Sequence, residues 1–137
     1  PVDDYHIAVR HRNHLGVMTQ NPQPVGTTAV LRDLSNGSGP PNGGAAATVN
    51  VGGVLLMPAG DGTRNGQVKY TGGGNDRDPI LTRIGGTVPT ATTTGYHPED
   101  LNLDGVVKYS GGANDRDAVL QAVGGTTPTA VRNAQLP

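Results

Sequence analysis

Hydrophobic and polar positions alternate along the first part of the chain, which is the pattern of short β-strands. Tyr5, Ile7 and Val9 fall on one face of the first such segment, which breaks near Asn13 before the pattern resumes. Later segments are separated by Pro- and Gly-containing breaks. The predicted strands cover residues 5–12, 14–19, 27–31, 47–51 and 54–57.

The second part of the chain predicts two short helices instead. Apolar residues at 80, 81 and 84 share a helix face, and Gly85-Gly86 ends this segment. Residues 118–123 repeat the pattern before a second Gly pair. An Asn-Asp-Arg-Asp tetrapeptide precedes each segment and supplies a capping side chain and early carboxylates, which suit a helix N-terminus.

Both helices belong to a duplicated segment. Residues 61–91 align with 100–130 without a gap, at an offset of 39 positions, and 18 of the 31 aligned positions are identical. A Gly- and Pro-rich loop at 35–45 interrupts the preceding part of the chain. We therefore divide the chain into a β-rich unit at 1–57, which contains this loop, and tandem repeats at 58–137.

Each repeat begins with oxygen-bearing side chains at alternate positions. In the second repeat Asp100, Asn102 and Asp104 occupy loop positions one, three and five, and Gly105 at position six permits a sharp turn. This spacing brings oxygens to one centre, as a hard cation such as calcium requires. One such loop alone is also typical of a metal-free turn, but the duplication favours two calcium ions as cofactors, with Val107 pointing inward to anchor the loop.

The back of each loop departs from the ordinary twelve-residue pattern, because position twelve of the second loop is Gly111. We interpret residues 109–113 as an insertion, after which one of two carboxylates at the helix start closes each site; the choice within each pair is open. The predicted metal ligands are Asp61, Thr63, Asn65, Gln67, Asp76 or Asp78 in the first loop and Asp100, Asn102, Asp104, Val106, Asp115 or Asp117 in the second. The front of the first loop has one carboxylate against two, so we expect it to bind calcium less tightly.

Composition indicates what the metal does. Leu, Ile and Val total 28 of 137 residues, Phe, Trp and Cys are absent, and 4 Tyr supply the aromatic area. Such a chain buries a thin core and has no disulfide, so bound metal or neighbouring subunits are expected to stabilise it. A net charge of −1 gives no footprint for nucleic acid, and the longest apolar run, 54–58, is too short for membrane insertion.

Other candidate chemistry is weaker. His11 and His14 lack a Cys or carboxylate partner at ligand spacing, so we expect surface or packing roles for them and for His6 and His97. No Ser lies in a nucleophile elbow and there is no Cys, so we predict that the protein is not an enzyme. The triplet 36–38 matches an acceptor site for glycan attachment.

The tandem Asp-x-Asn-x-Asp-Gly loops, each followed by a short helix, resemble dockerin-type calcium repeats. The strings 104–109, 114–117 and 10–19 are similar to the carboxy-terminal region of secreted or surface-attached bacterial proteins. This resemblance implies that the His-rich strand ends a β-sandwich. The expected fold class is therefore mainly β with short helices, with a partial, immunoglobulin-like β-sandwich unit followed by two calcium loop-helix repeats.

These features lead to an extracellular or cell-surface structural protein as the first hypothesis: a fibre subunit or adhesin stalk that self-associates through strand addition. The start at Pro1 rather than Met indicates a processed or truncated segment. The first alternative is a dockerin-like docking module that binds a separate receptor domain in a calcium-dependent way. The second is an accessory module of a secreted hydrolase.

Overall fold

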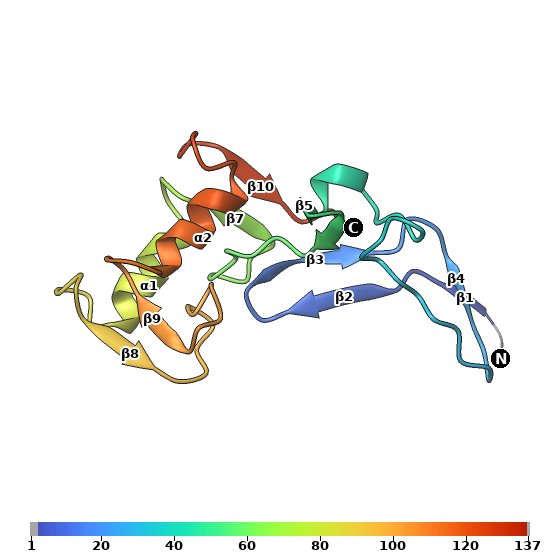
Figure 1. Cartoon of the computed structure of the whole chain (residues 1–137), viewed down its shortest axis with the longest axis horizontal. Coiled ribbons are helices and arrows are strands. Elements are labelled where there is room, and N and C mark those ends of the chain that lie inside the picture. The colour runs from blue at the N-terminus through green and yellow to red at the C-terminus, as the bar shows by residue number, and fades with distance from the viewer. Residues whose placement is uncertain (1–2, 137) are drawn as a thin grey trace. The chain divides into compact units, whose positions relative to one another are not determined.

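The computed structural model describes residues 3–136, which form two compact units (Figure 1). Of these residues, unit 1 contains 3–10, 16–58 and 134–136, and unit 2 contains 11–15 and 59–133. The expectation attached to Pro1 lies outside the described residues. A mainly β fold with two short α-helices is confirmed.

Unit 1 is built from short antiparallel pairs. Its sheets pair β1 (Asp3–Tyr5) with β4 (Gln23–Val25), β2 (Ala8–His11) with β3 (His14–Met18), and β5 (Val49–Val51) with β6 (Val54–Leu56). A 3-10 helix, η1 (Gly44–Ala46), lies within the predicted loop 35–45. The break predicted near Asn13 is confirmed as the turn between β2 and β3, and the tip of this hairpin, residues 11–15, belongs to unit 2.

Two strand predictions in unit 1 are wrong in detail. Residues 27–31 form no strand; they lie in an irregular stretch where Leu31 is 88% exposed. The long strand at 5–12 is divided into β1 and β2, and Tyr5 and Val9 remain exposed. Alternation alone does not bury a face, because a strand also needs a neighbour that covers it. The buried side chains come from the following strand, β3, through Leu15 and Val17.

Unit 2 contains the two repeats. In the structure each repeat extends by the strand that directly follows its aligned segment. The first repeat thus contributes β7 (Gln67–Lys69), α1 (Arg77–Arg83) and β8 (Thr92–Thr94), and the second contributes β9 (Val106–Lys108), α2 (Asp115–Ala122) and β10 (Val131–Asn133). Both predicted helices are confirmed, each beginning a few residues before its apolar positions. The asparagine of the tetrapeptide accepts hydrogen bonds from helix-start amides: Asn75 from Asp78 and Asn114 from Asp117.

The repeats exchange their strands. β8 of the first repeat pairs with β9 of the second, and β10 of the second pairs with β7 of the first. Thr92 pairs with Lys108, and the residues at the equivalent positions of the other repeat, Val131 and Lys69, pair in the same way. The two pairings are therefore reciprocal. Neither repeat completes its own two-stranded sheet. Unit 2 is therefore an interlocked pair, in which loss of one repeat removes a strand from the other.

The core of unit 2 follows the same pseudo-symmetry. Val68 and Val107, at equivalent positions, are both fully buried, which confirms the inward direction predicted for Val107. Ile80 of α1 and Val119 of α2 are also fully buried, and the two helices lie against each other (Figure 1). In the described part of the chain, neither helix has the length and apolar character needed to cross a membrane.

Candidate metal loops

The carboxylate at position one of each loop is buried and fixed by the loop backbone. Asp61 is 4% exposed and accepts hydrogen bonds from the amides of Asn65 and Gly66, both at 3.0 Å. Asp100, 2% exposed, accepts equivalent bonds from Asp104 and Gly105, both at 3.1 Å. The chain turns sharply at position six, where Gly105 has a φ of 85°, as the sequence predicts.

A second buried carboxylate enters each loop from the start of the helix. Asp115 is 0% exposed; its Oδ1 accepts from the amides of Leu101 at 2.7 Å and Asn102 at 3.2 Å. Its Oδ2 accepts from the Lys108 amide at 2.7 Å. Asp115 therefore ties the front of the loop to β9, through three backbone donors.

Asp76 plays the same part in the first loop. Its Oδ1 accepts from the Thr63 amide at 3.0 Å, and its Oδ2 accepts from the Lys69 amide at 2.8 Å. The Thr63 hydroxyl also donates to Asp76 at 2.9 Å and lies 3.4 Å from Asp61 Oδ1. This hydroxyl joins the two carboxylates of the first loop, whereas Asn102 at the equivalent position donates its amide to Asp104 and to the Ala113 carbonyl.

Each loop therefore buries two carboxylates as neighbours. The pKa of Asp115 is raised, mainly by burial and further by the charge of Asp100. Backbone hydrogen bonds from Lys108, Asn102 and Leu101 act in the opposite direction but do not cancel this increase. Burial likewise raises the pKa of Asp76, and the charge of Asp61 adds to that effect. A bound divalent cation would remove this repulsion, so the two clusters fit a cation in charge and in donor type.

The remaining acidic candidates lie on the other side of the helix start. Asp78 accepts from the side-chain amide of Asn75 at 2.8 Å, and Asp117 accepts from that of Asn114 at 2.9 Å. Both carboxylates are exposed and belong to the helix caps.

Positions five and seven of each loop form local turns. Asn65 and Asp104 accept from the backbone amides of Gln67 and Val106, both at 2.9 Å. The side chain of Gln67 is directed to Asn133 of β10. The turns keep the front of each loop folded back over its position-one carboxylate.

The tip of the β2–β3 hairpin contacts both loops, which the sequence did not indicate. Asn13 is 0% exposed; its carbonyl accepts from the amides of Gly60 and Asp61, both at 3.1 Å. Its side-chain amide donates to the carbonyls of Pro98 at 3.1 Å and Asp100 at 2.6 Å. One buried asparagine therefore joins the starts of the two loops. It lies more than forty positions before the first loop and more than eighty before the second.

The hairpin tip also brings a positive charge to the second loop. The Arg12 guanidinium lies 3.6 Å from Asp100 Oδ2 and stacks on the Tyr96 ring, 3.9 Å from its centroid. Within residues 3–136, Asp61 has no corresponding ion pair. Arg77 and Arg116 lie over Tyr70 and Tyr109 at 4.9 and 4.7 Å.

Within the described residues, no group of three or more His, Cys, Asp or Glu side chains is placed to hold a metal ion. The other oxygens of the loops come from amide, hydroxyl and backbone groups and, in the second loop, from the carboxylate of Asp104. No protein-family model, curated protein or solved structure matches this chain.

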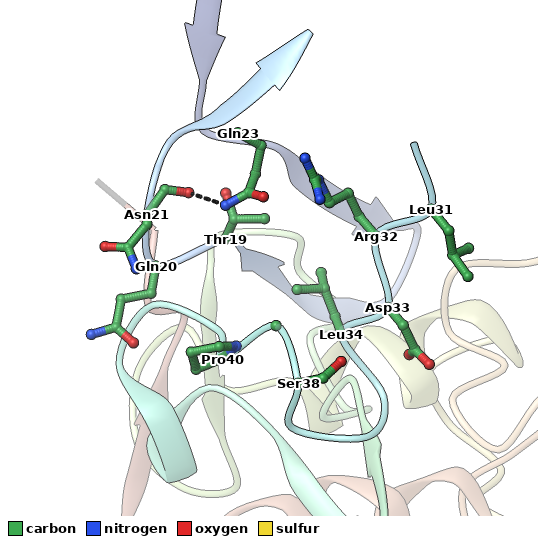
Figure 2. A pocket seen from close by; sticks show the side chains of 11 residues that line it. Thr19, Gln20, Asn21, Gln23, Leu31, Arg32, Asp33, Leu34, Ser38 and Pro40 are labelled. Atoms are coloured by element: carbon green, nitrogen blue, oxygen red, sulfur yellow. Dashed lines mark hydrogen bonds between the residues drawn. The ribbon is translucent and has the colours of Figure 1, made fainter. Parts of the chain in front are cut away.

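Unit 1 has a pocket of different character. Figure 2 shows the residues that line it, and the side chain of Gln23 donates to the Asn21 carbonyl at 2.8 Å. They are Thr19, Gln20, Asn21, Gln23, Leu31, Arg32, Asp33, Leu34, Ser38, Gly39 and Pro40. Its carboxylate, Asp33, accepts from the hydroxyl and the amide of Ser35 and from Asn36. The Ser35 hydroxyl bond is the main cause of the lowered pKa of Asp33. The negative charge of Asp33 is thus stabilised by hydrogen bonds within the turn at residues 33–36.

Proposed function

We propose that this chain is a calcium-stabilised structural protein of the cell exterior, in which each repeat binds one calcium ion. The observation that carries this proposal is the pair of buried carboxylates in each loop, Asp61 with Asp76 and Asp100 with Asp115. Two neighbouring buried anions favour a divalent cation, and the oxygens around them are of the kind calcium prefers.

The carboxylates that close the sites in this proposal are Asp76 and Asp115. Each accepts hydrogen bonds from the front of its own loop, whereas Asp78 and Asp117 accept from cap asparagines. The other donors in the proposal are Thr63, Asn65 and Gln67 in the first loop and Asn102, Asp104 and Val106 in the second. This dockerin-like arrangement would make calcium part of the fold.

The proposed order of calcium affinity depends on contributions that act in opposite directions. Two favour tighter binding at the second loop: Asp104 gives that loop a further carboxylate, and in the first loop the Thr63 hydroxyl already bridges the two carboxylates. Arg12, however, competes with a cation for Asp100. We propose that the second site is the tighter one, because the arginine is 3.6 Å away and is also held by Tyr96.

Self-association is proposed from unit 1. Its sheets are two-stranded, a size that is marginally stable in isolation. Large apolar side chains on these strands stay exposed: Tyr5, Val9, Val25, Val51, Val54 and Leu56. Strands from neighbouring copies would cover them and complete the immunoglobulin-like sandwich expected from the sequence, which makes the chain a subunit of a surface fibre or stalk.

A docking module is the second candidate. A groove beside α1 is lined in part by Asp78, Thr82 and the ion pair between Arg83 and Glu99, at 2.9 Å. The equivalent of Arg83 in the second repeat is Ala122, so the two helix faces differ. A dockerin-like module with two matching recognition faces is therefore less well supported than the structural role.

Electron microscopy of the full chain, in calcium and after chelation, tests the proposed function. We expect regular fibres in calcium that dissociate, or lose their order, when the chelator removes the metal. A monomer at high concentration in calcium, verified by mass measurement, would rule out the fibre. Tight capture of a single heterologous domain by that monomer would favour the docking module.

A further inference from the structure

The hairpin tip places two imidazole nitrogens and an amide oxygen in a small triangle. His11 Nδ1 lies 2.9 Å from His14 Nδ1, and Asn13 Oδ1 lies 3.1 Å from the first and 2.8 Å from the second. The two rings are nearly perpendicular, at 81°. Three donor atoms from one tight turn thus converge.

The identity of the oxygen in this triangle is fixed by its surroundings. The Nδ2 atom of Asn13 donates to the carbonyls of Pro98 and Asp100, so the other atom of the amide, Oδ1, must face the two rings. Asn13 is fully buried, and these bonds hold it in place. One corner of the triangle is therefore preorganised by the fold.

No placement of protons on the two rings makes all three close contacts of the triangle hydrogen bonds. If both Nδ1 atoms carry hydrogen, both can donate to Asn13, but the two N–H groups then oppose each other at 2.9 Å. If only one carries hydrogen, the lone pair of the other nitrogen faces the Asn13 oxygen. At least one close contact is repulsive in either case, whereas a cation bound by all three atoms would attract each of them and outweigh that repulsion.

The spacing fits a transition-metal ion. Donors about 2.0 to 2.1 Å from a metal and about 90° apart are about 2.9 Å from each other, which is the edge of an octahedral or square-planar site. Tetrahedral donors would be about 3.3 Å apart. Imidazole nitrogen suits nickel and copper, whereas calcium prefers oxygen ligands.

We propose that His11 Nδ1, His14 Nδ1 and Asn13 Oδ1 form a binding site for a divalent late first-row transition-metal ion, separate from the two calcium loops. His11 is exposed and His14 is half-buried, so the open side of the triangle is accessible to solvent ligands. Burial, with the charges of His11 and Arg12, lowers the pKa of His14 to about 4, which keeps this ring neutral at pH 7. The Arg12 guanidinium is held by Asp100 and Tyr96.

The site would also reinforce the contact between the hairpin and the second loop. Asn13 offers one end of its amide to the metal and the other to the Asp100 carbonyl. A metal at the tip would therefore hold the residue that joins the starts of the two loops.

Titration calorimetry of the full chain with Ni²⁺, in saturating calcium, tests this site. We expect one Ni²⁺ per chain and at least a tenfold loss of affinity in both His11→Ala and His14→Gln. His97→Ala is the matched control, because His97 lies outside the triangle and contacts the Thr94 carbonyl. Thermal melts in calcium without Ni²⁺ check that each variant is folded. If either His11→Ala or His14→Gln fails to fold, the other variant still tests the site.

Electron paramagnetic resonance with Cu²⁺ supplies an independent measurement. We expect coupling to two imidazole nitrogens in the wild-type chain and to one in His11→Ala. Absence of saturable Ni²⁺ binding, equal affinity in the wild type and both triangle variants, or an equal loss in His97→Ala would overturn the proposal. Coupling to fewer than two imidazoles in the wild type would overturn it as well.

Discussion

We expect Asp115→Asn to lower the free energy of unfolding by about 3 to 5 kcal/mol, even without calcium, because the substitution places a side-chain N–H donor opposite backbone N–H donors in a buried site. Asp115 accepts from Leu101, Asn102 and Lys108. The oxygen of an asparagine can face one side of this arrangement, but its amide group then faces the other. Each buried donor left without an acceptor costs about 1 to 3 kcal/mol.

Urea unfolding of the wild type, Asp115→Asn and Asp117→Asn measures this effect. Asp117 lies two residues away, is exposed and contacts the Asn114 side chain, so its substitution should cost less than about 1 kcal/mol. Added calcium should increase the difference between the wild type and Asp115→Asn, since the variant loses a proposed ligand. Equal midpoints for the two variants would contradict the role given to Asp115.

Asn13→Ala should destabilise the protein by about 2 to 4 kcal/mol, although the residue lies outside both loops. The substitution removes the donor to the buried carbonyl of Asp100 and the donor to that of Pro98, and leaves a space beside them. The backbone bonds from Asn13 to Gly60 and Asp61 remain possible, so the loss measures the side chain alone.

Thermal unfolding in calcium checks this second prediction. Asn36→Ala is the control, because Asn36 is exposed and its hydrogen bonds stay within residues 33–38. We expect a change of less than about 1 kcal/mol for the control. A melting temperature for Asn13→Ala that equals that of the control would show that the hairpin tip does not join the repeats.

The sequence predicts the local structure of the repeats well because their signals are local. Capping by Asn75 and Asn114, the turn at Gly105 and the inward direction of Val107 all depend on residues within a few positions. The same capping explains why Asp115 faces the loop while Asp117 does not. Asp115 is the first helical residue, and Asp117 returns to the cap residue, Asn114.

The long-range arrangement could not be predicted in the same way. β7, β8, β9 and β10 have three residues each, too few to show a period of two, and each pairs with the other repeat. The contacts of Arg12 and Asn13 join segments that are far apart in sequence. The exposure of Leu31 has the same origin, because burial depends on a covering partner rather than on alternation.

Calcium binding by the chelator-treated full chain, measured by titration calorimetry, is the most direct test of the two buried carboxylate pairs as metal sites. We expect two calcium ions per chain, the tighter one lost in Asp115→Asn and the weaker one lost in Asp76→Asn, with both retained in Asp117→Asn. Absence of saturable binding at millimolar calcium, or two ions still bound by Asp115→Asn and by Asp76→Asn, would contradict it.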